Sequence, residues 1–234
     1  MENNFYKESI SLVIPVYNEE IIIDECVRSS YAQLSKFFLD FEFIIIDDGS
    51  TDNTVNLLSG LKNEFNRLVV LTNKINMGIG PSLLRGLKYS SKNYIIHNGA
   101  DRPFSMEDIE KVFPLIYGHD ILVISRYQYS GYSLYRRIIS FINLALLRGL
   151  FPLKLKDFNF IQIYSRKVIS SIDPKSKSAG FLVPEILLSA HKLNFSITET
   201  KHRYHPRVKG NATAGKLEEV VKSFIDMVKF WYRY

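Results

Sequence analysis

The sequence repeats a short apolar run, a polar turn and an amphipathic segment, and this repeat constrains the fold more than any other feature. Residues 11–16 and 41–46 are apolar and rich in β-branched side chains, and helical periodicity follows each run. Similar strand-like runs occupy residues 68–71, 94–97 and 121–125. Strands that alternate with helices favour a parallel sheet. We therefore predict an α/β fold, a single Rossmann-like domain with a mostly parallel sheet flanked by helices.

The second half of the chain is less regular. Helical periodicity predicts helices, including amphipathic ones in the C-terminal half, and two further apolar runs predict strands. The helices are expected at residues 82–87, 106–116, 134–150, 184–191 and 217–234, and the strands near 158–164 and 195–199.

Composition limits the cellular setting. Hydrophobic residues make up 46% of the chain and charged residues 23%, which is typical of a globular protein. The single cysteine, Cys26, cannot form an internal disulfide, and residues 1–10 lack the apolar core of a signal peptide, so a cytoplasmic location is expected. The longest apolar run, residues 138–147, is too short to span a bilayer, and any membrane contact is therefore expected to be peripheral.

The formal net charge of +6 favours an acidic partner, such as a nucleotide, a phospholipid surface or nucleic acid. The lysines and arginines are scattered and no nucleic-acid recognition motif occurs, which argues against nucleic acid. No G-x-G-x-x-G follows the first strand, which argues against a dinucleotide oxidoreductase.

Three motifs follow predicted strands, where parallel α/β sheets bind their ligands. They are PVYNEE at residues 15–20, DDGSTD at 47–52 and NMGIG at 76–80. The adjacent acids could accept hydrogen bonds from a base or a ribose, although Asp48 or Ser50 could instead cap the following helix. The glycines allow a tight turn or a close approach of the backbone to a ligand.

The order and position of these motifs resemble glycosyltransferase family 2, of the GT-A type, in which they read VIPVYNEE, VDDGSTD and N-x-G-x-G. The similarity continues through ILVISR at residues 121–126, Arg136 or Arg137, Asp157, Glu185 and Arg207, so it covers nearly the whole chain. The sequence looks most like the branch that loads a sugar onto a polyprenyl phosphate, such as the dolichyl-phosphate mannosyltransferases. The resemblance implies a GT-A domain over residues 1–212, with a nucleotide-sugar half to about residue 126 and an acceptor half over 127–212. A C-terminal amphipathic helix would occupy residues 213–234.

The resemblance also implies a set of site residues, with Asp48 on the base of the nucleotide. The nucleotide sugar, UDP- or GDP-linked, is expected to contact Pro15, Val16, Tyr17, Glu19, Asp47, Asp48, Asn76, Gly78, Gly80, Asn98, Ala100, Asp101 and Arg102. Catalytic roles are expected for Asp101, Glu185 and Arg207, and contacts with the acceptor or its phosphate for Arg126, Arg136, Arg137, Arg207 and Lys209.

The metal motif of the family, D-x-D, departs from its pattern here. Setting MEDI at residues 106–109 against the family's PEDI places Gly99-Ala100-Asp101 at the motif, so the first aspartate is missing. One carboxylate remains for Mg²⁺ or Mn²⁺, which take oxygen ligands. We therefore predict weak metal dependence or none, with Asn98 supplying a neutral oxygen and Arg102 neutralising diphosphate charge. The alternative is a degenerate, inactive site.

The acceptor decides which groups an inverting transfer of a hexose needs. A lipid phosphate is already anionic and needs no base, whereas a hydroxyl needs a carboxylate such as Glu185 or Asp157. Each of these residues could instead have a structural role. Asp157 could be a turn residue, Glu185 an acid in the first turn of a helix, and Arg207 part of a solvated basic loop. Polyprenyl phosphate is the leading acceptor. A sugar hydroxyl in polysaccharide or glycolipid synthesis, or a non-catalytic nucleotide-sugar binder, remains the alternative.

Two amphipathic segments bear on the membrane. Residues 134–150 are apolar around most of the predicted helix, and residues 217–234 combine apolar, aromatic and cationic side chains at helical spacing. They favour peripheral attachment to the cytoplasmic face of the cell membrane. Packing against the core, a homodimer or a membrane-protein partner would also cover such helices.

Overall fold

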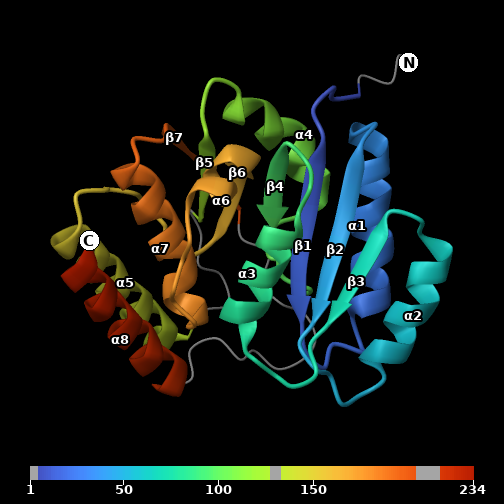
Figure 1. The fold of residues 1–234 in the computed structure, drawn as a ribbon, viewed down its shortest axis with the longest axis horizontal. Helices are drawn as coiled ribbons and strands as arrows, with labels where there is room; N and C mark the ends of the chain where they lie inside the picture. Colours follow the sequence, from blue (N-terminus) through green and yellow to red (C-terminus); the bar gives the residue numbers. More distant parts are fainter. Residues whose placement is uncertain (1–4, 127–132, 204–216) are drawn as a thin grey trace.

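A computed structural model describes residues 5–126, 133–203 and 217–234. The predicted fold class is confirmed, since the described strands form one mostly parallel sheet flanked by helices (Figure 1). The strands are β1 (Ile10–Val16), β2 (Phe41–Asp47), β3 (Leu68–Thr72), β4 (Tyr94–His97), β5 (Ile121–Arg126), β6 (Ile161–Ser165) and β7 (Ile197–His202). The helices are α1 (Ile23–Phe37), α2 (Thr54–Glu64), α3 (Ile79–Tyr89), η1 (Met106–Asp108), α4 (Ile109–Val112), η2 (Phe113–Ile116), α5 (Leu134–Leu150), α6 (Arg166–Ser171), α7 (Ala179–Lys192) and α8 (Leu217–Arg233).

The sheet has the order β3-β2-β1-β4-β6-β5-β7. Strands β1 to β4 pair in parallel and so do β5 and β7, whereas β6 runs antiparallel to both of its neighbours, β4 and β5. The interior strands are almost entirely buried because helices cover both faces, as their continuous apolar sequences require.

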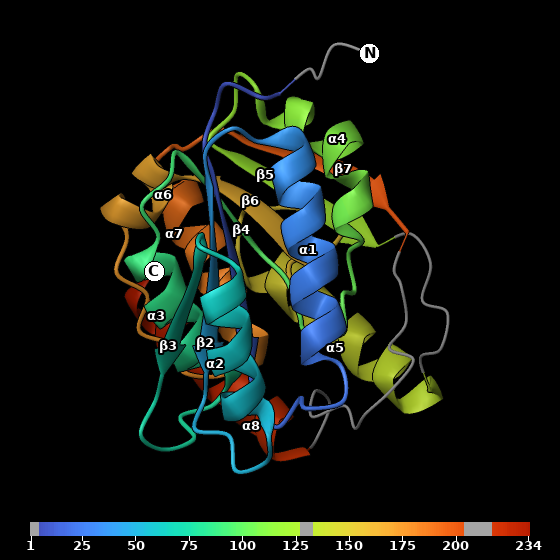
Figure 2. The same ribbon diagram turned by 90° about the vertical axis from the view of Figure 1, so that its right-hand side faces the viewer.

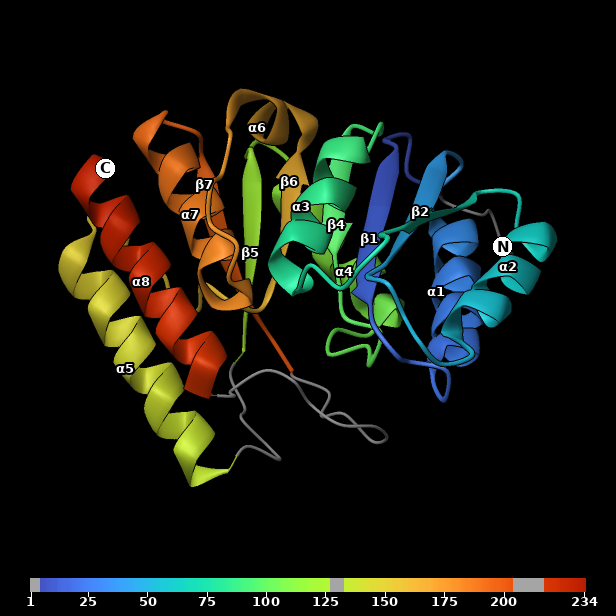
Figure 3. The same ribbon diagram turned by 60° about the horizontal axis from the view of Figure 1, so that its bottom comes forward.

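Two hydrophobic clusters make the core, one on each face of the sheet. Helices α1, α2 and α4 cover one face and α3, α6 and α7 cover the other, as Figure 2 shows. Helices α5 and α8 lie side by side at the β7 end of the molecule (Figures 1 and 3). The ring of Phe151, which follows α5, lies 5.8 Å from that of Phe230 and 5.3 Å from that of Tyr234.

The parallel strands bring the predicted motifs to one edge. In the register of the sheet, Val16 at the end of β1 pairs with Asp47 at the end of β2, which pairs with Thr72 at the end of β3. Figure 3 turns this edge toward the viewer. The loops that follow these strands therefore lie next to one another, as the sequence predicted.

Two predicted helices differ from the structure. Residues 106–116 form three short pieces, η1, α4 and η2, instead of one helix, and Pro114 lies at the start of the last piece. Helix α7 begins at Ala179, five residues before the predicted start, and Pro184 lies buried inside it. The prediction placed Pro184 at the first turn because proline is common there, and it underestimated how far the apolar run before it extends the helix.

Candidate nucleotide-sugar site

Asp48, the second acid of the DDGSTD motif, is 3% exposed and lies at the centre of a hydrogen-bonded cluster. Its Oδ1 accepts hydrogen bonds from Asn73 Nδ2 and Ser82 Oγ, each at 2.8 Å, and from the Met77 N–H at 2.9 Å. Its Oδ2 accepts the Gly78 N–H at 2.8 Å. Asp48 therefore fixes residues 76–80, here called the glycine loop.

The first two motifs are joined by hydrogen bonds. The N–H of Asn18, a residue with φ of 54°, donates to Ser50 Oγ at 2.9 Å, and the Thr51 N–H donates to Asn18 Oδ1 at 2.8 Å. The Glu19 N–H donates to Thr54 Oγ1 at 2.9 Å. Asparagine tolerates a positive φ better than most residues, which explains its place at this turn. The two loops therefore form one rigid rim.

The remaining residues of this rim differ in exposure. Val16 is buried and Pro15 is half-buried, whereas Tyr17 is 38% exposed. Asp47 is fully buried, and its Oδ1 accepts the Ser50 N–H at 3.1 Å, while its Oδ2 has no hydrogen-bond partner among the described residues. Of the three residues Pro15, Val16 and Tyr17, Tyr17 is the most exposed, and its contact with the nucleotide sugar stays a prediction.

The two glycines of the third motif are required for different structural reasons. Gly78 has φ of 91°, a left-handed conformation that strains other residues, and its N–H faces Asp48. At Gly80 a Cβ would overlap the carbonyl oxygen of Lys177, so this glycine allows α3 to approach the loop before α7. Sequence reasoning assigned both to the ligand and missed the packing role of Gly80, because Lys177 is far away in the chain.

The loop after β4 carries the altered metal motif. Asn98 Nδ2 donates to the Phe104 carbonyl at 2.8 Å, and Asn98 Oδ1 accepts the Gly99 N–H at 3.0 Å, so this side chain holds its own loop. Ala100 is buried. A Cβ at Gly99 would lie 2.5 Å from Asp101 Oδ1. A side chain at position 99 would therefore require the Asp101 carboxylate to move.

Arg102 and Asp101 lie near the first half of α1. Arg102 has φ of 51°, donates its N–H to the Gly99 carbonyl at 3.0 Å and forms an ion pair with Glu25 of α1. Burial raises the pKa of the Cys26 thiol to about 12, with Arg102 acting against the rise and the charges of Asp101 and Glu19 adding to it. Charged groups from the loops after β1 and β4 thus lie near the start of α1.

These residues do not fit a site that holds a divalent cation through two protein carboxylates. Asp101 is the one acid of the motif, and the oxygen of Asn98 is already engaged within its own loop. Nowhere in residues 5–126, 133–203 and 217–234 do three His, Cys, Asp or Glu side chains gather in a way that could hold a metal ion. Magnesium sites do often combine one or two carboxylates with substrate phosphates, and Asp101 would be the protein's contribution to such a site.

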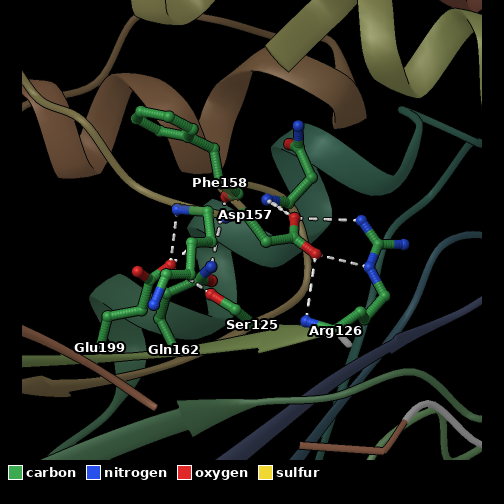
Figure 4. Close-up of polar contacts among 8 residues, drawn as sticks. Ser125, Arg126, Asp157, Phe158, Gln162 and Glu199 are labelled. Atoms are coloured by element: carbon green, nitrogen blue, oxygen red, sulfur yellow. Dashed lines mark hydrogen bonds and ion pairs between the residues drawn. The ribbon is translucent and has the colours of Figure 1, made fainter. Parts of the chain in front are cut away.

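Arg126 forms a buried, bidentate ion pair with Asp157 (Figure 4). Its Nε lies 2.6 Å from Asp157 Oδ2 and its Nη2 lies 3.0 Å from Oδ1, and the two side chains are 11% and 5% exposed. Glu199 of β7 accepts hydrogen bonds from Ser125 Oγ and from the Lys156 N–H, the latter at 2.7 Å. This network holds β5, β7 and the segment before β6 together. The sequence pointed to Arg126 and Asp157 but gave no sign of the other members.

His97, at the end of β4, lies in the same buried region. Its Nε2 is 2.6 Å from Gln162 Oε1, and burial lowers the pKa of the imidazole below its ordinary value of 6.5. Below pH 6.5 the unfolded chain therefore binds a proton that the folded protein does not. We expect the free energy of unfolding to fall by up to about 1.4 kcal/mol per pH unit as the pH drops from 6.5 toward the folded-state pKa.

Urea unfolding between pH 7.5 and 5 would measure this loss. His97→Asn should remove this part of the pH dependence, whereas His119→Asn, at an exposed position, should keep it. Equal slopes for wild type and His97→Asn would contradict the prediction.

Glu185 lies in α7, 2% exposed, and all the contacts seen are structural. Its Oε1 accepts the Lys175 N–H at 3.0 Å and pairs with Arg233 Nη2 at 2.7 Å, and its Oε2 accepts the Ser176 N–H at 2.7 Å. The carboxylate is thus enclosed by α7, α8 and the loop between α6 and α7, and its catalytic role stays a prediction.

The predicted acceptor residues are spread over two elements and a segment outside the described residues. Arg136 is half-buried and Arg137 is exposed, both in the first turn of α5. Arg207 and Lys209 lie outside the described residues. The structure therefore leaves the predicted phosphate contacts of these four residues as predictions.

The mostly parallel sheet, with Asp48 and the glycine loop hydrogen-bonded at the ends of its strands, defines an α/β protein. The sequence profile described as Glycosyl transferase family 2 matches residues 11–173, and the chain belongs to this family. Membership of this family confirms the resemblance that the order of the motifs indicated.

The chain spans about half of the length of the curated relatives it matches, or less. An undecaprenyl-phosphate 4-deoxy-4-formamido-L-arabinose transferase of Pseudomonas fluorescens is 28% identical over 167 residues, 70% of this chain and 48% of the relative. A poly(ribitol-phosphate) beta-glucosyltransferase of Bacillus spizizenii is 37% identical over 94 residues, 39% of this chain and 14% of the relative.

Among solved structures, glucosyl-3-phosphoglycerate synthase of Mycobacterium tuberculosis, in complex with Mn²⁺, UDP-glucose and phosphoglyceric acid, has a TM-score of 0.72. It is 18% identical, and the match covers 97% of this chain and 80% of that one. This likeness supports the fold.

Proposed function

We propose that this glycosyltransferase is inverting and moves a hexose from a UDP- or GDP-sugar to a polyprenyl phosphate at the cytoplasmic face of the membrane. The choice of a lipid phosphate as acceptor rests on the burial and ion pairing of the two candidate bases. Glu185 is buried against Arg233, and Asp157 is buried against Arg126. An ion-paired, enclosed carboxylate is a poor proton acceptor for a sugar hydroxyl, whereas a lipid phosphate needs no base.

An exposed apolar surface supports a lipid acceptor. The α5–α8 face consists of exposed side chains in the first halves of these neighbouring helices, namely Leu134, Tyr135, Ile138, Phe141, Ile142, Leu217, Val221, Phe224 and Ile225. Helix α5 has one buried residue, Leu147, and the first turn also carries Arg136 and Arg137. Apolar side chains beside cations suit the interface of an anionic membrane. Across the described parts of the chain, every helix is too short or too polar to cross a bilayer.

The names of the relatives point to both acceptor classes. The Pseudomonas relatives transfer to undecaprenyl phosphate and cover about 70% or more of this chain. The Bacillus relative, a poly(ribitol-phosphate) beta-glucosyltransferase, has the higher identity over a shorter stretch, and it favours the second candidate, a hydroxyl of a glycan polymer. The longer match and the paired carboxylates favour the lipid phosphate.

The proposed reaction depends weakly on divalent metal or not at all. Support comes from the single carboxylate of the motif and from the Asp101 side chain, which occupies the space beside Gly99. Arg102 lies next to Asp101 and would offset diphosphate charge if it left Glu25. The non-catalytic alternative predicts nucleotide binding with no transfer.

The test is transfer of labelled sugar from a panel of UDP- and GDP-sugars to a short-chain polyprenyl phosphate, with Mg²⁺, with Mn²⁺ and with excess chelator. We expect lipid-linked product with one class of donor. The rate of transfer in excess chelator should stay within about tenfold of the rate with metal. An Asp101→Asn variant, measured under the same conditions, shows how far transfer depends on the one remaining carboxylate of the motif. Product that appears only on a glycan hydroxyl would favour the second candidate, and nucleotide binding without any product would favour the non-catalytic role.

A further inference from the structure

Four consecutive backbone N–H groups before α7 all point at carboxylates. The N–H groups of Lys175 and Ser176 donate to Glu185, as described above, and those of Lys177 and Ser178 donate to Asp226 Oδ2 at 3.1 and 2.9 Å. Hydrogen bonds to an ionised acceptor are stronger than neutral ones. The two acids therefore fix the 175–178 loop from two sides.

Helix α8 supplies one of the two acids and a cation that pairs with the other. It carries Asp226, and its Arg233 pairs with Glu185. The helix lies close to α7, since a Cβ at Gly180 would overlap Ser223 Oγ. One face of α8 is thus bound to the 175–178 loop and to α7, while the opposite face carries the exposed apolar side chains of the α5–α8 face.

The 175–178 loop in turn contacts the glycine loop. The Lys177 carbonyl oxygen lies where a side chain at Gly80 would begin, so the loop backbone packs directly against the first turn of α3. Two residues later, Ser82 donates its hydroxyl to Asp48 Oδ1 at 2.8 Å. A continuous set of contacts therefore runs from Asp226 through Lys177 and Gly80 to Asp48.

We propose that Asp226 is a positioning residue for the nucleotide sugar, and that α8 holds the glycine loop in the geometry that binds the donor. The inference rests on the proposed function, because it assumes that the donor binds beside Asp48. Asp226 touches neither donor nor acceptor. It acts by accepting the Lys177 and Ser178 N–H groups, which sets how far the 175–178 loop presses on Gly80.

The test compares Asp226→Ala, Asp226→Asn and Asp173→Ala by titration calorimetry with UDP and with GDP. Asp226→Ala should raise the dissociation constant of the nucleotide that wild type binds by about two- to thirtyfold, the range of coupling through contiguous contacts. Asp226→Asn keeps one acceptor oxygen and should restore part of the affinity. Asp173 pairs with the side chains of Lys88 and Lys175 on the surface, and its removal should leave the affinity unchanged.

A purely structural role for Asp226 would lower the melting temperature while the folded protein bound nucleotide normally. Hydrogen exchange of Asp226→Asn offers a second readout, since the Met77 and Gly78 amides on Asp48 should exchange faster while those of β1 and β2 do not. Unchanged affinity in Asp226→Ala, with unchanged exchange in Asp226→Asn, would overturn the inference and leave the donor site standing. If wild type bound neither nucleotide, the proposed donor site would fail, and this inference with it.

Discussion

Asp48→Ala is expected to reduce the affinity for the donor nucleotide at least tenfold and to lower the free energy of unfolding by about 3 kcal/mol or more. The substitution removes the acceptor of the buried Ser82 hydroxyl and of the Met77 N–H. Asn73 Nδ2 and the Gly78 N–H each lose one acceptor and keep another, Ser82 Oγ and Asn76 Oδ1 respectively. Each buried donor left unpaired costs about 1–3 kcal/mol. The glycine loop also loses the side chain that fixes its geometry. Calorimetry with UDP and GDP, together with urea unfolding, would measure both effects.

Asp52→Ala is the matched control for Asp48. Asp52 belongs to the same motif, and its Oδ1 accepts the Thr54 N–H at 3.0 Å at the start of α2. Its Oδ2 also accepts the Glu20 N–H at 3.3 Å. Loss of these two hydrogen bonds should cost about 1–2 kcal/mol and leave nucleotide affinity unchanged. If Asp48→Ala bound nucleotide as wild type does, the assignment of the donor to this cluster would be wrong.

Asp157→Ala is expected to destabilise the protein by about 3–5 kcal/mol, because it leaves the Arg126 guanidinium, 11% exposed, without its carboxylate. The Asn159 N–H, which donates to Asp157 Oδ1 at 2.9 Å, loses its acceptor as well. Urea unfolding at pH 7 measures the change. Replacing both partners by apolar residues, Arg126→Met with Asp157→Leu, should recover much of the stability.

Asp24→Ala is the control for this pair. Asp24 lies 3.0 Å from Arg28 on the surface of α1, with both side chains about half exposed, and such pairs contribute about 0–1 kcal/mol. The apolar double variant adds a functional readout. Restored stability without transfer would indicate that Arg126 or Asp157 also serves the reaction. An Asp157→Ala protein as stable as Asp24→Ala would contradict the buried-pair argument.

The local pattern of the chain was sufficient for most elements, because strands such as β1, β2 and β5 are mostly apolar runs and helices such as α5 have their own periodicity. Strand β4 and helix α5 have the predicted bounds. The direction of β6 was not predicted, since a single apolar run carries no information on which way it pairs. The pairing of Tyr94 with Ser165 and of Ile121 with Tyr164 decides that direction, and these pairs join distant segments.

The sequence alone determined which acids and glycines gather at the edge of the sheet, since the carboxyl ends of parallel strands meet there whatever their loops do. The tertiary structure decided what each of them does. Asp48 acts on a loop some thirty residues away, Gly80 makes room for Lys177, and Glu185 faces Arg233. These roles depend on contacts between residues remote in the chain, and a side chain's partners are set by packing rather than by its neighbours in sequence.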